Sequence, residues 1–198
     1  MKRIISVLLA MLSVVLVSAQ ESKLVNLQTE VRFDYQREYL NGDAVKSNSG
    51  FKGKYLNVIL NGSFNEHFSY SYRQRLNKAH ADQSFFDATD WIYLTYKLNK
   101  NWSFAGGKQV VGIGGYEYDR APIDLYFCSE YWNNIPCYQF GVSTTYTTNS
   151  GKDSFMAQFC ESPFNFRNED LYAYNLMWYG SHDWYNSIWS VNAQEFAP

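Results

Sequence analysis

Strand-like segments of this chain are joined alternately by long polar stretches and by tight turns. We count nine such segments between Leu24 and Phe196. The first four intervals run long, short, long, short: Asn41–Gly50, Asn65–His67, Lys78–Ala88 and Asn99–Asn101. Antiparallel barrels of bacterial outer membranes have short periplasmic turns and longer external loops. The alternation therefore predicts an all-β, antiparallel transmembrane barrel, because a soluble sandwich has no reason to sort its loops by length.

The N-terminus has the pattern of a secretory signal peptide. Lys2 and Arg3 precede an apolar run that ends at Val17, and small residues follow up to Ala19. The run is shorter than the ~20 apolar residues of a spanning helix. We expect cleavage after residues 1–19, with Gln20 as the mature N-terminus and 20–198 as a partial outer-membrane barrel domain. Without the signal, fifteen basic residues face nineteen acidic ones, a balance that gives nucleic acid no electrostatic attraction.

Residues of the strand-like segments alternate between an apolar and a polar set. In the first segment Leu27, Thr29, Val31, Phe33 and Tyr35 alternate with Gln28, Glu30, Arg32, Asp34 and Gln36. Successive side chains of a strand point to opposite faces, so a barrel in lipid places the apolar set outside. We predict the same for Phe68, Tyr70, Tyr72, Leu94, Tyr96, Phe104, Tyr138, Phe140, Val142, Ala157, Phe159, Tyr174, Leu176, Trp189 and Val191.

Large aromatic residues sit where the short turns meet their strands. They are Phe64, Phe68, Trp102, Tyr146, Phe155, Trp178 and Trp184. Aromatic residues make up 19% of the chain, a bias typical of strands and of the girdles at membrane interfaces. We interpret these residues as a periplasmic girdle, with scattered strand-end aromatics of an ordinary β protein as the alternative.

The longest interval, Gly112–Cys137, separates the fifth and sixth strand-like segments. The stretch Gly107–Ser143, GKQVVGIGGYEYDRAPIDLYFCSEYWNNIPCYQFGVS, resembles the phosphate-selective porin O and P family. The resemblance implies a sixteen-stranded homotrimeric porin in outer-membrane lipid, a third loop folded inward, and passage of small anions. It also maps the basic lining of the pore to Arg73, Arg75, Lys108 and Arg120. About nine of the sixteen strands are present, so we expect an N-terminal portion.

The inward loop has its own candidate residues. Tyr116, Tyr118, Leu125, Phe127 and Trp132 need cover from water, so we expect them to contact inward-facing residues such as Tyr93 or Gln139. Pro122 favours the start of a short helix within the constriction. The acids at the constriction, Asp119 and Asp124, together with Glu30, Asp34 and Glu130, reduce the positive charge of the lumen.

Arg73 and Arg75 lie two residues apart, so they project from the same side of one strand about 7 Å from each other. Such a pair can pass an anion from site to site. Pairing with Glu30 and Asp34 in a structural wall is the alternative.

Lys108 follows Gly106-Gly107 and falls, by strict alternation, on the lipid side. A bulge at the glycines would turn Lys108 into the lumen. Otherwise its ammonium would reach the rim by extending along the wall.

Catalytic and cofactor motifs are not evident in the sequence. The histidines have no ligand spacing, and Gly112-Ile113-Gly114-Gly115 lacks the Lys-Ser/Thr of a phosphate loop. We therefore expect no enzyme, cofactor or metal. The three cysteines allow two alternatives, a disulfide bridge or buried free thiols, and we favour the free thiols.

We expect a passive, anion-preferring pore for small hydrophilic solutes. The alternatives are a non-conducting outer-membrane barrel, as an adhesin or assembly partner, and a secreted soluble β-sandwich that binds glycans.

Overall fold

The computed structural model describes residues 24–198 except 79–83, 121, 126 and 166–169. The predicted signal peptide lies outside these residues. The described chain forms one antiparallel sheet of nine strands in sequence order. They are β1 (Asn26–Leu40), β2 (Asp43–Ser63), β3 (Phe68–Arg75), β4 (Thr89–Lys97), β5 (Trp102–Val110), β6 (Tyr138–Thr147), β7 (Asp153–Glu161), β8 (Tyr172–His182) and β9 (Tyr185–Phe196). The predicted strand number and pairing are confirmed.

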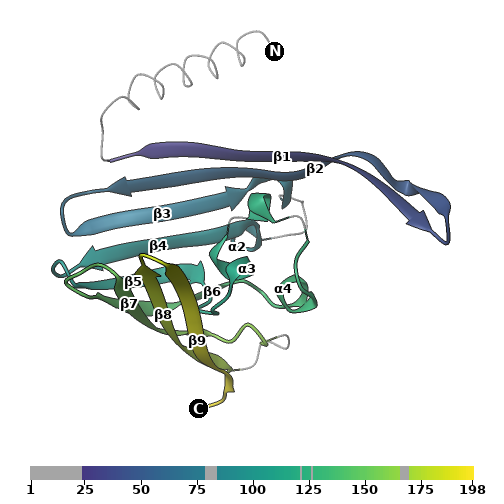
Figure 1. Ribbon diagram of the computed structural model, residues 1–198. Coiled ribbons are helices and arrows are strands. Elements are labelled where there is room, and N and C mark those ends of the chain that lie inside the picture. Colours follow the sequence, from purple (N-terminus) through teal and green to yellow (C-terminus); the bar gives the residue numbers. More distant parts are fainter. Residues whose placement is uncertain (1–23, 79–83, 121, 126, 166–169) are drawn as a thin grey trace, which may run out of the picture.

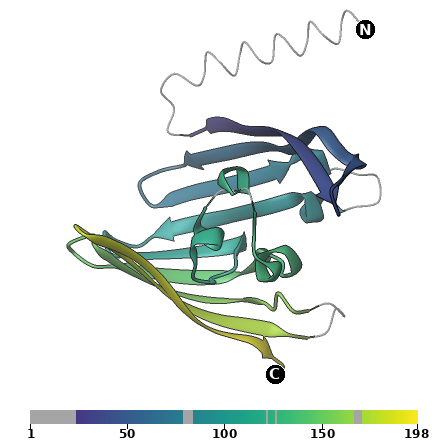
Figure 2. The same cartoon turned by 45° about the vertical axis from the view of Figure 1, so that its right-hand side comes forward.

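The sheet is curved, and the long segment between β5 and β6 lies on its concave side (Figures 1 and 2). This segment contains three short helices, α3 (Tyr116–Asp119), η2 (Pro122–Asp124) and α4 (Glu130–Asn134). The segment between β3 and β4 contains η1 (Leu76–Lys78) and α2 (Phe85–Ala88). No helix in the described ranges has both the length and the apolar composition to cross a membrane. The inward fold of the third loop, with helical turns including one that starts at Pro122, is confirmed.

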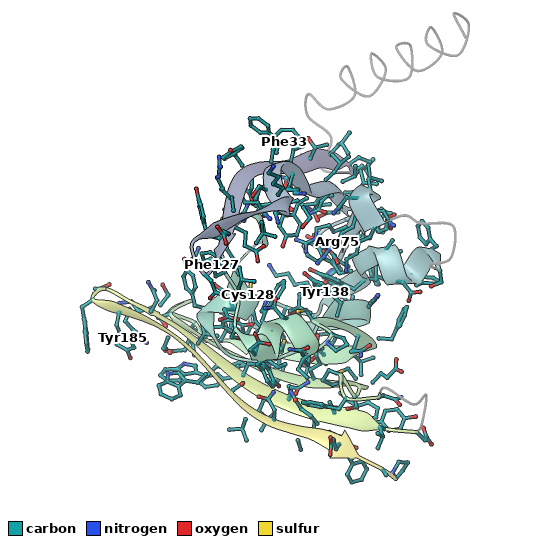
Figure 3. All side chains as sticks on the ribbon, turned by 90° about the vertical axis from the view of Figure 1, so that its right-hand side faces the viewer. Phe33, Arg75, Phe127, Cys128, Tyr138 and Tyr185 are labelled. Atoms are coloured by element: carbon teal, nitrogen blue, oxygen red, sulfur yellow. The ribbon has the colours of Figure 1, made fainter. Side chains whose placement is uncertain are left out.

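The register of the strands groups the predicted apolar set on the convex face. Leu27 pairs with Leu60, Tyr70 with Leu94, and Leu176 with both Ala157 and Val191. Most of these side chains are exposed although they are apolar, and Phe33 points away from the concave side in Figure 3. A sheet in water buries one apolar face, so this convex face needs a cover that the described chain does not supply.

Aromatic residues form one continuous row across β5 to β9 on the convex face. Trp102 pairs with Tyr146, Tyr146 with Phe155, Phe155 with Trp178, and Trp178 with Trp189. The row lies beside the short turns, where the predicted girdle was placed. Trp189 continues the row in the place of Trp184, which lies in the β8–β9 turn and packs against Tyr185.

The first predicted long loop is wrong. β1 ends at Leu40 and β2 begins at Asp43, so a two-residue turn replaces the interval Asn41–Gly50. Asn41 has φ 52° and Gly42 has φ 92°. Asn-Gly is the strongest short hairpin signal because both positions need positive φ. The hairpin extends well beyond the end of β3, whose last pairing joins Arg75 to Asn57.

Of the two alternatives for Lys108, the bulge at Gly106-Gly107 is not observed. Pairing runs without a shift from Gly106 to Lys108, and Lys108 is in register with Ile92 and Phe140 of the convex face. Gly107 has φ 131°, and a Cβ there would lie 2.3 Å from the carbonyl oxygen of Ile92. The glycine therefore serves a close approach of β4 to β5 and leaves the alternation of faces unchanged.

Candidate pore constriction

A ladder of amide side chains holds the start of the long loop against the concave face. Gln158 of β7, Asn175 of β8 and Asn192 of β9 are neighbours in register. Asn175 Nδ2 donates to Gln158 Oε1 at 3.0 Å, and Asn192 Nδ2 donates to Asn175 Oδ1 at 2.7 Å. Gln158 also accepts from the Gly112 N–H at 2.7 Å, and Asn192 donates to the Gly112 carbonyl at 2.6 Å. Both backbone groups of Gly112 are thereby satisfied by the wall.

Two glycines allow this close approach. A Cβ on Gly112 would lie 2.9 Å from the Met156 methyl and 3.0 Å from Asn175 Cβ. A Cβ on Gly114 would lie 2.8 Å from the backbone nitrogen of Ser190, whose hydroxyl accepts from the Gly114 N–H at 2.7 Å. The GIGG segment is therefore the contact between loop and wall. Sequence reasoning tested it only as a phosphate loop and missed this role.

Arg32 of β1, at the other edge of the sheet from β9, holds the middle of the loop. Its Nη1 donates to the carbonyl oxygens of Ile123 at 3.1 Å and Leu125 at 2.6 Å. Its Nε donates to Asp34 at 2.9 Å, which keeps the guanidinium oriented. Leu125 is 9% exposed. The loop therefore spans the concavity from β7–β9 to β1, as expected of a constriction.

The last part of the loop is braced within itself and against β9. Ser129 caps α4 by accepting from the Trp132 N–H, and its own hydroxyl donates to Glu117 at 2.8 Å. Trp132 Nε1 donates to the Glu117 carbonyl at 3.2 Å, which joins α4 to α3. Tyr131 donates to Gln194 of β9 at 3.0 Å. These bonds fix two of the short helices that occupy the concave side.

The predicted loop residues divide into inward and exposed groups. Tyr118 lines one hollow with Tyr93, and Trp132 lines another with Gln139, so each shares a cavity with its expected neighbour. Tyr116 and Phe127 are 65% and 86% exposed. Burial raises the pKa of Tyr118, whose hydroxyl is buried without a hydrogen-bond partner among the described residues. The expectation of cover thus holds for only part of the aromatic set.

The two acids predicted at the constriction lie on separate turns of the loop. Asp119 ends α3 and lines the same hollow as Tyr118. Asp124 ends η2, next to the segment that Arg32 holds.

Arg73 is a buried structural residue in this arrangement. It is 1% exposed, and its Nε donates to Asp90 at 2.7 Å while Nη2 donates to the Tyr138 hydroxyl at 2.6 Å. Its Nη1 lies 3.7 Å from Glu30, and its guanidinium lies 4.0 Å from the centre of the Trp91 ring. The structural alternative is therefore correct for Glu30, although the main partner is Asp90.

Arg75 shares that partner, because its Nε lies 2.8 Å from the same carboxylate. Asp34, the other predicted partner, pairs with Arg32. Tyr138, predicted on the outer face, instead turns its hydroxyl to the concave side and lies near Arg75 in Figure 3. Tyr138 is the first residue of β6, where the chain leaves the loop. Its side chain can therefore turn around the end of the strand to the concave side.

A hollow of about 490 Å³ at the long-loop end of the sheet is lined by Arg75, Lys78 and Lys108 together with Asp87 and Asp90. Burial, and then the charge of Arg75, lower the pKa of Lys78. Lys108 Nζ donates to the Phe86 carbonyl at 2.6 Å, which places its ammonium at the rim, as the alternative to a bulge predicted. Three cations face two acids there, so the hollow has an excess of positive charge.

Arg120 lies away from this cluster. It follows α3 and lines a separate hollow with Asp119 and Lys152, a residue of the β6–β7 turn. Its guanidinium lies 5.1 Å from the centre of the Tyr116 ring. The four predicted basic residues therefore occupy three distinct places: a buried ion pair, the rim, and the short-turn side of the loop.

All three cysteines are free thiols. Cys137 closes the loop, and its carbonyl accepts from the Val111 N–H at 2.9 Å. Burial raises the pKa of Cys137 to about 11, so it is protonated at neutral pH. Among the described residues, no group of three metal-ligating side chains comes together.

Comparison with known proteins gives the family. The model of the phosphate-selective porin O and P family matches residues 25–183, which is most of the chain. The chain therefore belongs to this family of outer-membrane porins, a class of channels. No curated protein and no solved structure matches this chain.

Proposed function

We propose that this chain forms part of the wall and the constriction of a passive diffusion channel for small hydrophilic solutes. The observation that carries the proposal is the loop from Gly112 to Cys137, which is held across the concave side at both ends. On the concave face beneath the loop, strands β5 to β9 carry the polar residues Gln109, Ser143, Gln158, Asn175 and Asn192. A polar inner face of this kind suits a lumen that holds a loop and water, whereas the interior of a soluble sandwich is apolar.

Our proposal includes a preference for anions that is set at the two ends of the constriction. At the long-loop end, Lys78 and the other cations of the rim hollow exceed Asp87 and Asp90 by one charge. On the short-turn side, Arg120 and Lys152 line a hollow with Asp119, and Lys152 is paired with Asp183 at 3.3 Å, so Arg120 is the cation that faces Asp119. Arg73 does not contribute to selectivity in this proposal, because its guanidinium is enclosed by its partners. A small excess of charge supports a modest preference.

The environment of the pore is also part of the proposal. β1 and β9 do not pair with each other in the described sheet, and unpaired edges are costly in lipid. We propose a sixteen-stranded barrel that assembles as a homotrimer, after export and cleavage before Gln20. The uncovered convex face and its aromatic row favour membrane lipid over the water that a soluble glycan-binding sandwich would meet.

Reversal potentials of the full-length porin in planar bilayers, measured across a salt gradient, test the proposed preference. Lys78→Glu combined with Arg120→Glu should move the reversal potential toward cation preference. Lys46→Glu makes the same change of charge on the exposed part of the β1–β2 hairpin, and it should have little effect. An unchanged reversal potential in the folded double variant would remove anion preference from the proposal. Absence of any conductance would favour the non-conducting barrel.

A further inference from the structure

An apolar groove of about 760 Å³ lies on the convex face, on the opposite side of the sheet from the loop. Its floor contains Gly106 and Ala157. Its two walls include Leu94 and Phe104 on one side, and Phe159 and Leu176 on the other. The groove exists because small residues lie between rows of large ones.

The floor of the groove is open at Gly106. A Cβ at this position would meet only Val142 Cγ1, at an ordinary 3.9 Å, so the backbone does not require glycine there. The absent side chain leaves room for something outside the sheet. This contrasts with Gly107, where a Cβ would collide with the neighbouring strand.

A cation lies beyond the groove on the same strand, toward the long-loop rim of the sheet. Lys108 is two residues beyond Gly106 on the same face, about 7 Å along the strand. Its convex neighbours in register, Ile92 and Phe140, are both apolar. The ammonium has three donors, and one of them goes to the Phe86 carbonyl.

The charges around the Lys108 ammonium leave it available to an anion. Lys108 shares its hollow with two acids, Asp87 and Asp90, and with two cations, Arg75 and Lys78. Neither acid is among its ion-pair partners within 4.0 Å in the described structure. Asp87 accepts from the Ser84 N–H in the α2 cap, and Asp90 is held by Arg73 and Arg75.

We infer that the groove binds one acyl chain of a phosphate-bearing membrane lipid, whose phosphate pairs with Lys108. The occupant must be apolar along the groove and anionic at its Lys108 end, which is the chemistry of a lipid with a charged headgroup. A second copy of the chain would present its own convex face, where the described residues that line the groove are uncharged, so a headgroup phosphate fits Lys108 better. The inference depends on the outer-membrane location of the family and not on the proposed conductance. A phosphate on Lys108 leaves Arg75 and Lys78 against Asp87 and Asp90 in the rim hollow, so the proposed anion preference then depends on Arg120.

Native mass spectrometry of the full-length porin, released from vesicles of phosphatidylglycerol and phosphatidylcholine in equal amounts, tests the inference. We expect the native protein to retain phosphatidylglycerol. Lys108→Met removes the charge and keeps the length of the side chain, so the preference should fall about fivefold. Gly106→Leu fills the floor and should reduce retention of both lipids. Lys46→Met, the matched control on the hairpin, should retain lipid as the native protein does.

Three outcomes would overturn the inference. Unchanged retention in Lys108→Met would remove the phosphate contact, and unchanged retention in Gly106→Leu would remove the groove. A protein dimer or trimer that Gly106→Leu dissociates, without any lipid retained by the native protein, would assign the groove to a second copy. The folded state of each variant is checked by its resistance to unfolding in detergent, so loss of lipid is separated from loss of the barrel.

Discussion

Asp90 is the residue on which two buried guanidinium groups depend. It is 4% exposed and accepts from both Arg73 and Arg75. A buried ion pair adds little net stability when it is intact, but removal of one partner leaves an uncompensated charge. The carboxylate is thus more important for keeping the arginines in place than for any contact with a solute.

Replacement of Asp90 by Asn should therefore lower the free energy of unfolding by about 3–5 kcal/mol, because Arg75 loses its charged partner and Arg73 keeps only Glu30, at 3.7 Å. Asp183→Asn is the matched control, since Asp183 pairs with Lys152 at 3.3 Å on an exposed turn. Exposed pairs of this kind contribute roughly 0–1 kcal/mol. Urea unfolding of the full-length porin in lipid vesicles measures both. Equal effects of the two variants would show that the arginines are held by other contacts.

The sequence predicts the position of the arginines but not their partner. Alternation places Arg73 and Arg75 on the inner face, as observed. Asp90 reaches them because the register of β3 and β4 shifts between Arg73 and Gln74. A shift of one residue depends on local backbone pairing, which residue alternation does not encode. For Lys108 the sequence left two alternatives open, a bulge and a side chain extended to the rim, and the continuous register of β5 agrees with the second.

At the scale of elements, the loop is fixed by bonds between distant strands. Gln158 joins the loop to β7, and Asn175 and Asn192 extend the contact to β8 and β9. These residues are ordinary polar inward positions in the sequence. Their function as a ladder depends on adjacent strands being in register, which becomes visible only when the sheet is assembled.

Gln158→Leu should cost about 1–3 kcal/mol, since it leaves the Gly112 N–H without its acceptor inside the wall. It should also increase the fluctuations of single-channel current as the loop loosens. Gln28→Leu, on the exposed inner face of β1, serves as the control and should change neither quantity. Planar-bilayer recordings and urea unfolding provide the two measurements. A Gln158→Leu pore with native current fluctuations and native stability would contradict the role of the ladder.

The faces of the strands were predicted more fully than their connections. A period of two residues determines each face, so Leu176, Val142 and most of the apolar set lie on the convex side as expected. Connection length was misjudged at Asn41-Gly42, where the turn signal was present but was read as the start of a loop.

Leu176→Arg distinguishes a membrane wall from a soluble sheet. Leu176 is 59% exposed on the convex face, so in water the substitution would be harmless. In lipid, an arginine near the bilayer midplane costs about 2–4 kcal/mol. Thr145→Arg on the concave face is the control, because a water-filled lumen accepts the charge. The yield of folded porin in outer-membrane fractions should fall for Leu176→Arg alone. Equal yields would contradict the membrane assignment of the convex face.

At the scale of the whole molecule, the convex face is largely exposed, the curved sheet forms the wall, and the segment between β5 and β6 lies on the concave side (Figure 1). β1 and β9 are the unpaired edges of the described sheet, and such edges are costly in lipid. Family membership agrees with a porin-type wall. In the proposed channel, the segment between β5 and β6 narrows an aqueous path.

Single-channel conductance of a loop-deleted porin tests that claim directly. Residues 116–134 are replaced by a short Gly-Ser linker, which keeps Gly112, Gly114 and their contacts with the ladder. The control replaces residues 39–44 by Asn-Gly, which shortens the β1–β2 hairpin but keeps Glu38 and Val45 as neighbours in register. We predict that conductance rises severalfold in the loop-deleted porin and stays near the native value in the control. A loop-deleted porin that folds and keeps the native conductance would contradict the constriction.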